Sequence, residues 1–301
     1  MNMMKRKRNP LGMSDRAFDI LLTVMTSVFL VIVLYPLIYA VSSSFSSGNA
    51  VADGRVILWP VEFSVKGYEL VFNNKEVWRG LANTLFYVAG TTTVSLVSTT
   101  LVAYVLSRKT YQGRRFFNLV YLITMWFNGG MIPTYILYSK LHMVNSRWGY
   151  LFLTSVAISN MILLRTYFRT SIPEELLEAA QMDGITDFGY FRKIAIPLSK
   201  PVLAVVTLYE IVEEWNSYFM PMIYLRSREL QPLQLVLRRI LENTKMEASM
   251  LMNTALLNDM SQMGEVMKYA LIVVSTAPML ILFPFVQKFF TKGVMIGSLK
   301  G

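Results

Sequence analysis

The chain has 301 residues, of which 54% are hydrophobic and only 16% are charged, and its net charge at pH 7 is +10. This composition is typical of a membrane protein rather than of a soluble domain. The absence of cysteine and the single histidine exclude disulfides, thiolate metal sites and multi-histidine metal sites. Basic residues cluster just outside apolar segments, as the positive-inside rule describes, which argues against nucleic-acid binding.

Six apolar segments are long enough to cross a hydrocarbon core of about 30 Å, which predicts an all-α membrane protein with six transmembrane helices. The first is longer than the apolar region of a typical signal peptide, and no small-residue cleavage site follows it closely. A basic tail at 1–17 precedes a single membrane domain at 18–301. The six segments cover residues 18–41, 81–107, 116–139, 148–168, 201–225 and 266–290.

The distribution of lysine and arginine predicts that both chain termini lie in the cytoplasm. Basic residues are concentrated in the tail, in the turns that follow the second and fourth segments, and after the sixth. The segments at 42–80 and 226–265 have largely balanced charges and are predicted outside. Short helices are expected in them at 65–72 and 233–241, the latter either contacting a docked partner or packing on the bundle.

Asn128-Gly129-Gly130 and Pro133 interrupt the third apolar segment. Glycine and proline at membrane depth break the helix and leave backbone groups that need partners from protein or water. This part of the chain is therefore not expected to face lipid.

The stretch from Pro173 to Pro197 is charged and amphipathic, although it lies between two long apolar segments. Proline suits the start of a helix, and glutamates in the first turns complement its dipole. Asp183-Gly184 is typical of a turn, and a second short helix is expected at 186–192, ended by Ile196-Pro197. Two short helices joined by a sharp bend would dock into a groove on a partner and transmit its motion.

The order and spacing of residues in this stretch resemble the EAA loop of bacterial ATP-binding cassette importers. In that family the loop is the coupling helix of the membrane subunit and fits a cleft on the ATPase subunit. The family usually has leucine before the final proline, where this chain has Ile196. The alternative interpretation is an ordinary amphipathic helix on the membrane surface. The coupling residues implied by the resemblance are Glu178, Ala179, Ala180, Asp183, Gly184, Ile194 and Pro197.

Three further segments resemble the carbohydrate-uptake class of these importers, in the branch that serves oligosaccharides and polysaccharide fragments. They are FNGGMIPTY at 127–135, PLSKP at 197–201 and EWNSYFMPMIYL at 214–225. The resemblance implies the type I importer permease fold in the bacterial inner membrane. It implies a second homologous permease, two ATPase subunits that bind ATP and Mg, and an extracytoplasmic solute-binding protein. The chain has no G-x-x-x-x-G-K-S/T loop, so it is not expected to hydrolyse ATP or hold a cofactor itself.

Glu210, Glu213 and Glu214 lie within the fifth apolar segment, where charges are costly and usually face protein or water. At 100° per residue they fall within an arc of roughly 100° on one helix face. One interpretation is that this stripe lines an aqueous route or a subunit seam. The other is that one or two of the acids pair with arginine or lysine on a neighbouring helix and hold the bundle together. If the stripe lines the route, it argues against alginate, one candidate substrate of this branch, because alginate is a polyanion.

Amide and aromatic side chains in the spans can meet a sugar through hydrogen bonds and ring stacking. The alternative for each is interhelical hydrogen bonding or core packing, at about 0.5–2 kcal/mol per bond. The candidates for the translocation path are Asn83, Asn128, Glu210, Glu213, Glu214, Trp215, Asn216 and Tyr218.

Two other classes of protein remain open at this stage. A membrane-embedded glycan-processing enzyme would need a paired acid and base, and Glu210 with Glu214 is the one candidate pair. These residues lie about one turn apart on one helix, whereas a catalytic pair usually approaches its substrate from different elements. The other class is a subunit that docks a partner without transporting anything.

Overall fold

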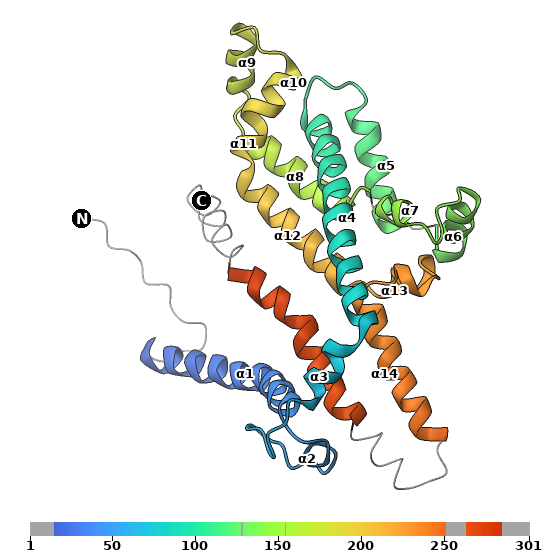
Figure 1. The fold of residues 1–301 in the computed structure, drawn as a ribbon. Helices are drawn as coiled ribbons and strands as arrows, with labels where there is room; N and C mark the ends of the chain where they lie inside the picture. The colour runs from blue at the N-terminus through green and yellow to red at the C-terminus, as the bar shows by residue number, and fades with distance from the viewer. Residues whose placement is uncertain (1–14, 128, 154, 251–262, 285–301) are drawn as a thin grey trace. The chain divides into compact units, whose positions relative to one another are not determined.

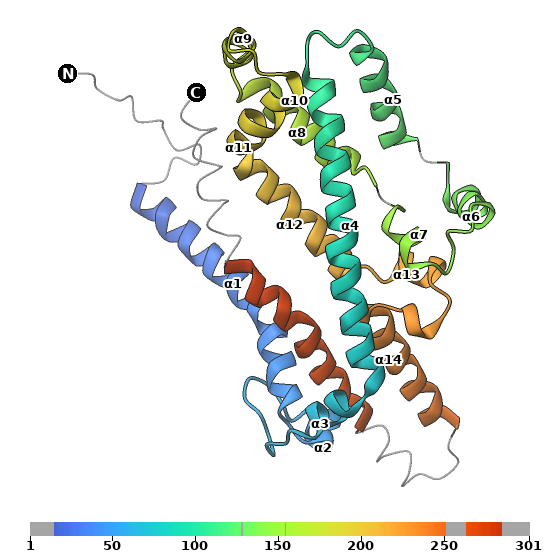
Figure 2. The same ribbon diagram turned by 45° about the horizontal axis from the view of Figure 1, so that its top comes forward.

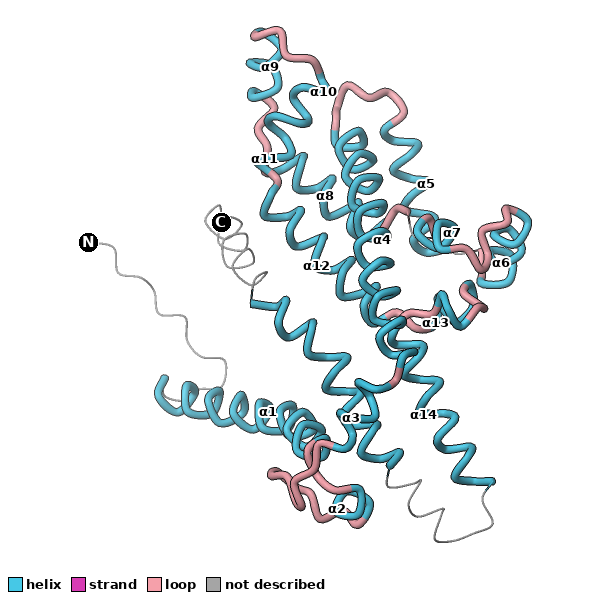
Figure 3. The backbone as a smooth tube through the Cα atoms, viewed as in Figure 1, coloured by secondary structure: helices cyan, strands magenta, loops and turns pink. Residues whose placement is uncertain are grey.

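The structure is a computed structural model that describes residues 15–127, 129–153, 155–250 and 263–284 (Figure 1). Within these ranges every regular element is a helix, in agreement with the predicted all-α class (Figure 3). The chain forms two compact units, Met1–Asn73 with Asn243–Val274 and Asn74–Glu242 with Ser275–Gly301. Most of the predicted basic tail lies outside the described residues.

The first unit contains α1 (Asp15–Ser44), α2 (Gly48–Ala52) and α3 (Lys66–Asn73). The helix predicted at 65–72 is confirmed by α3, whereas α2 was not predicted. The Ser47 hydroxyl caps α2 by accepting a hydrogen bond from the Ala50 N–H. Ala50 and two neighbouring valines form a small buried core beside this cap.

The second unit is built around α4 (Lys75–Ser107), which packs along α8 (Ile158–Thr170) and α12 (Lys200–Asn216) (Figure 2). The buried face of α4 is rich in serine and threonine, whose small side chains allow helices to approach closely. This unit also contains α5 (Arg114–Trp126), α6 (Met131–Lys140), α7 (Arg147–Leu151) and α13 (Phe219–Tyr224), and α14 (Leu233–Met250) begins in it.

Three of the predicted apolar segments are broken rather than continuous. The expected break in the third lies between α5 and α6, and Gly130 has a φ of +88° there. The fourth was predicted as one helix at 148–168, but α7 and α8 are separate. In the fifth, Ser217 is extended between α12 and α13. Pro221 has no N–H to donate to the Ser217 carbonyl, so a regular helix cannot continue across this point.

Three of the described helices are long and apolar enough to cross a membrane: Arg16–Ser44, Lys75–Ser107 and Met263–Pro284. The helices Asp187–Leu198 and Lys200–Asn216 are bent by 79° relative to each other. If this bent pair is treated as one span, the number rises to four. The helix predicted at 233–241 is present as the first part of α14.

Candidate functional site

The stretch from Pro173 to Leu198, which we call the elbow, contains two short helices at a sharp bend (Figure 1). The first helix is α9 (Glu175–Met182). Gly184, two residues after its end, has a φ of +72°. The Gly184 N–H donates to the Gln181 carbonyl at 3.0 Å, and the Ile185 N–H donates to the Ala180 carbonyl at 2.9 Å. These two bonds define a Schellman end, in which glycine supplies the left-handed residue. The predicted turn at Asp183-Gly184 is confirmed.

The second helix begins at α10 (Asp187–Tyr190), where the Thr186 hydroxyl accepts a hydrogen bond from the Gly189 N–H at 3.1 Å. It continues through a π-helical turn (Phe191–Ala195) into α11 (Ile196–Leu198). The helix ends at Leu198, one residue after the end predicted at Ile196-Pro197, and the chain bends by 79° before α12. Pro197 is tolerated because it lies in the first turn of α11.

The inner face of the elbow is anchored in the main core of the second unit. Leu177, Tyr190 and Phe191 are buried among side chains of α4 and α8, including Leu164. The ring centroids of Phe191 and Tyr104 of α4 lie 4.6 Å apart. Because protein cores are closely packed, the elbow and the long helices are mechanically connected through this core.

The outer face of the elbow exposes apolar and acidic side chains together. Met182 is 89% exposed and adjoins the exposed Asp183 in the chain, and Phe188 is 68% exposed and adjoins the exposed Asp187. Large exposed apolar side chains rimmed by polar ones are typical of a protein interaction surface. Of the predicted coupling residues, Glu178, Ala179, Asp183, Gly184 and Pro197 are exposed, Ile194 is half-buried and Ala180 is buried.

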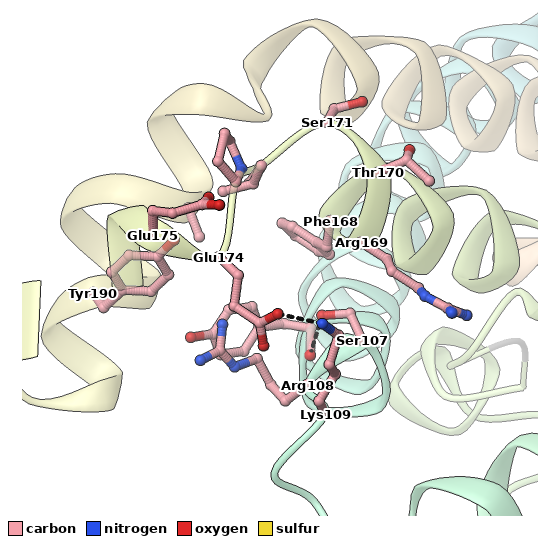
Figure 4. A pocket seen from close by; sticks show the side chains of 14 residues that line it. Ser107, Arg108, Lys109, Phe168, Arg169, Thr170, Ser171, Glu174, Glu175 and Tyr190 are labelled. Atoms are coloured by element: carbon pink, nitrogen blue, oxygen red, sulfur yellow. Dashed lines mark hydrogen bonds and ion pairs between the residues drawn. The ribbon is translucent and has the colours of Figure 1, made fainter. Parts of the chain in front are cut away.

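The root of the elbow lies against the end of α4, beside a cavity of about 440 Å³ (Figure 4). Lys109 Nζ forms an ion pair with the Glu174 carboxylate. This hydrogen-bonded contact lowers the pKa of the Glu174 carboxyl. The Arg108 guanidinium lies 5.6 Å from the Tyr104 ring centroid and 5.7 Å from that of Tyr190. Arg108 and Lys109 belong to the basic turn after the second apolar segment, and these contacts were not predicted from the sequence.

The three acids of α12 do not share one environment. Glu210 is 8% exposed and accepts a hydrogen bond from Asn160 of α8 at 2.6 Å. Glu214 accepts a hydrogen bond from the Tyr150 hydroxyl of α7 at 3.1 Å. Glu213 is exposed and lines a mainly apolar cavity of about 680 Å³. Two of the acids thus lie inside the bundle, bonded to an amide and a hydroxyl, and one lies on an open face.

Two of the other path candidates make structural contacts. Asn83 is buried, donates to the Glu229 carbonyl at 2.8 Å and accepts from Arg147 at 2.9 Å. The Trp215 indole is buried and donates to the Ser275 carbonyl at 3.0 Å.

The remaining path candidates lie on more open parts of the chain. Asn216 lines the same cavity as Glu213. The Arg238 guanidinium lies over the Tyr218 ring, with 5.2 Å between its carbon and the ring centroid. Asn128 lies outside the described residues.

Residues 3–296 match the family described as binding-protein-dependent transport system inner membrane component, and the chain belongs to this family. It is therefore a transport permease subunit and not an enzyme.

Several known proteins are similar over nearly the whole chain. The polygalacturonan/rhamnogalacturonan transport system permease protein YtcP of Bacillus subtilis (strain 168) is 34% identical, over 96% of this chain and 100% of that protein. Protein LplC of the same organism is 32% identical over 96% of each chain. A chain in the crystal structure of a bacterial ABC transporter involved in the import of the acidic polysaccharide alginate is 37% identical. The two structures align with a TM-score of 0.84, and the alignment covers 96% of this protein and 100% of the transporter chain.

Proposed function

We propose that this chain is one of two permease subunits of an ATP-binding cassette importer and that the elbow couples it to an ATPase subunit. The observation that carries the proposal is the division of the elbow into an anchored inner face and an exposed outer face. Leu177 and Tyr190 fix it to α4 and α8, while Met182 and Phe188 remain available to a partner.

The proposed complex contains a second permease, two ATPase subunits and a solute-binding protein outside the membrane. ATP and Mg bind to the ATPase subunits. When those subunits close, the elbow moves with them, and the bundle changes from inward-open to outward-open. A complete shift of such an equilibrium, from 1:99 to 99:1, needs a difference of about 5.5 kcal/mol in nucleotide binding between the two states.

The proposed topology has six spans in the bacterial cytoplasmic membrane, with both termini and the elbow inside. Three of those spans are the broken segments described above. Their unpaired backbone groups require partners within the protein, because lipid supplies none. The breaks therefore favour a position toward other protein, either within this chain or against the second permease.

The proposed substrate is an oligosaccharide or polysaccharide fragment that carries carboxylates, with alginate as the first candidate. Two similar proteins are named for polymers that contain uronic acids. The acids of α12 are compatible with such a substrate, because Glu210 and Glu214 are hydrogen-bonded within the bundle. Only Glu213 among these three is exposed.

Transport by the assembled importer in proteoliposomes tests this proposal. We expect ATP-dependent accumulation of oligouronates, with little accumulation of uncharged oligosaccharides of equal length. Uptake of uncharged sugars alone would contradict the proposed substrate class. ATPase binding without uptake of any saccharide would instead identify a docking subunit that does not transport.

A further inference from the structure

Four arginines gather where the end of α4, the start of α5 and the end of α8 meet. Arg114 and Arg115 lie in the first turn of α5, and Arg165 and Arg169 lie one turn apart on α8. Together they line a cavity of about 350 Å³. The other residues that line it are Leu106, Asn118, Leu119 and Leu122.

In the part of the chain that the structure describes, no acid forms an ion pair with this arginine cluster. The charge of Glu174 acts on Arg114 at longer range, but that carboxylate is already paired with Lys109. No carboxylate lines the cavity, and none of the four arginines forms an ion pair with a described residue. Arg165 donates a hydrogen bond to the Asn118 amide oxygen, which carries no charge. Four cations at close range repel one another unless an anion compensates them.

The neighbouring basic residues are satisfied by the chain itself, which sets the cluster apart. Lys109 is paired with Glu174, and Arg108 lies over two tyrosine rings. Figure 4 shows the Arg169 guanidinium directed away from the Lys109–Glu174 pair. Arg169 thus borders the cavity at the root of the elbow as well, but it forms no ion pair with Glu174.

We infer that the arginine cluster binds the phosphate of an anionic phospholipid in the cytoplasmic leaflet. Basic pockets between helices on the cytoplasmic side are typical sites for such headgroups. The inference rests on the proposed topology, which places this end of the helices inside.

The apolar surroundings favour a lipid over an acidic protein surface. Leu119 is 57% exposed and Leu122 is 39% exposed, and no residue of α5 is buried. Phe116, at 64% exposed, extends this apolar surface. A phospholipid provides both a phosphate for the guanidinium groups and long acyl chains for the exposed leucines.

The test measures phosphatidylglycerol retained by the complete purified importer, without nucleotide or saccharide, by native mass spectrometry. The variant is Arg115→Gln with Arg169→Gln, because both side chains are exposed and their loss leaves the core intact. The matched control is Arg79→Gln with Arg228→Gln, two exposed arginines of the segments predicted outside. We expect the variant to bind phosphatidylglycerol roughly 30-fold more weakly, and the control to bind it as the wild type does.

Two further arms separate the sources of the anion. Added inorganic phosphate should not displace the lipid from the wild-type complex, and phosphatidylcholine should not be retained. Equal phosphatidylglycerol retention by variant and wild type would overturn the inference. It would also be overturned if the variant kept its lipid but lost its ATPase subunits, which would identify the cluster as a protein contact. Because this assay needs no transport, failed uptake by the importer would leave its result unchanged.

Discussion

Lys109, two residues after the end of α4, forms an ion pair with Glu174, which lies 65 positions later in the chain and immediately precedes α9. The pair connects the longest described helix of the second unit to the start of the elbow. Both side chains are substantially exposed, so the pair contributes little to overall stability. Its effect should be local, on how tightly α9 is held.

The first prediction concerns the pH dependence of this attachment. Because the pKa of Glu174 is lowered in the folded protein, the contribution of the pair is present above the ordinary carboxyl pKa. It is lost as the pH falls through the lowered value. We expect amide exchange in α9 to increase on acidification, and Glu174→Gln to show the increased exchange already at neutral pH. Glu242→Gln, which removes the exposed Arg238 pair, is the control and should leave α9 unchanged.

The second prediction concerns the backbone of the elbow. Gly184→Ala places a side chain at a φ of +72°, which costs about 1–2 kcal/mol. Gly54→Ala introduces nearly the same strain at a φ of +69°, and at both positions the added methyl group meets no atom within 4 Å. We expect Gly184→Ala to reduce uptake at least severalfold with normal membrane insertion, and Gly54→Ala to leave uptake unchanged. Equal uptake by the two variants would contradict the assignment of the elbow.

The third prediction concerns the outer face of α9. Glu178 is exposed, so Glu178→Lys should leave the melting temperature unchanged while abolishing saccharide-stimulated ATP hydrolysis and uptake. The matched charge reversal Glu229→Lys, at another exposed glutamate, should affect neither. Both are measured in proteoliposomes containing the whole importer. Normal coupling in Glu178→Lys would place the ATPase contact elsewhere.

The fourth prediction separates the acids of α12. Glu210→Ala leaves the Asn160 amide without its partner inside the bundle, which costs about 1–3 kcal/mol of stability. Glu213→Ala removes an exposed carboxylate, so we expect unchanged thermal stability and altered uptake of charged saccharides. Thermal unfolding and uptake are measured on the same preparations. If Glu210→Ala melts normally, the carboxylate–amide bond is not structural.

The sequence predicted local turns well, because their residues determine their own backbone. Gly184 and Gly130 marked two breaks that the structure contains. The break between α7 and α8 was missed because its residues, 152–157, include neither glycine nor proline. A tertiary contact accompanies this break, since the Ala157 N–H donates to Thr99 of α4 at 3.2 Å. Contacts of this kind are not visible in a single chain segment.

The candidate path residues show the same limit. Helical periodicity grouped Glu210, Glu213 and Glu214 in one stripe, but it carries no information about which neighbour each side chain meets. Asn160 and Tyr150 come from two other helices, so the separation of the acids depends on the packing of three elements. The Lys109–Glu174 pair was missed for the same reason.

The most direct test of the central claim is cross-linking from the outer face of the elbow. The chain has no cysteine, so Met182→Cys, at a position that is 89% exposed, introduces a unique thiol. Trp59→Cys, at a position that is 81% exposed in a segment predicted outside, is the control. We predict that the cysteine at 182 cross-links to an ATPase subunit and resists reagents added outside the cell, whereas the cysteine at 59 reacts with them. Labelling of position 182 from outside, or no cross-link to any ATPase subunit, would contradict the account.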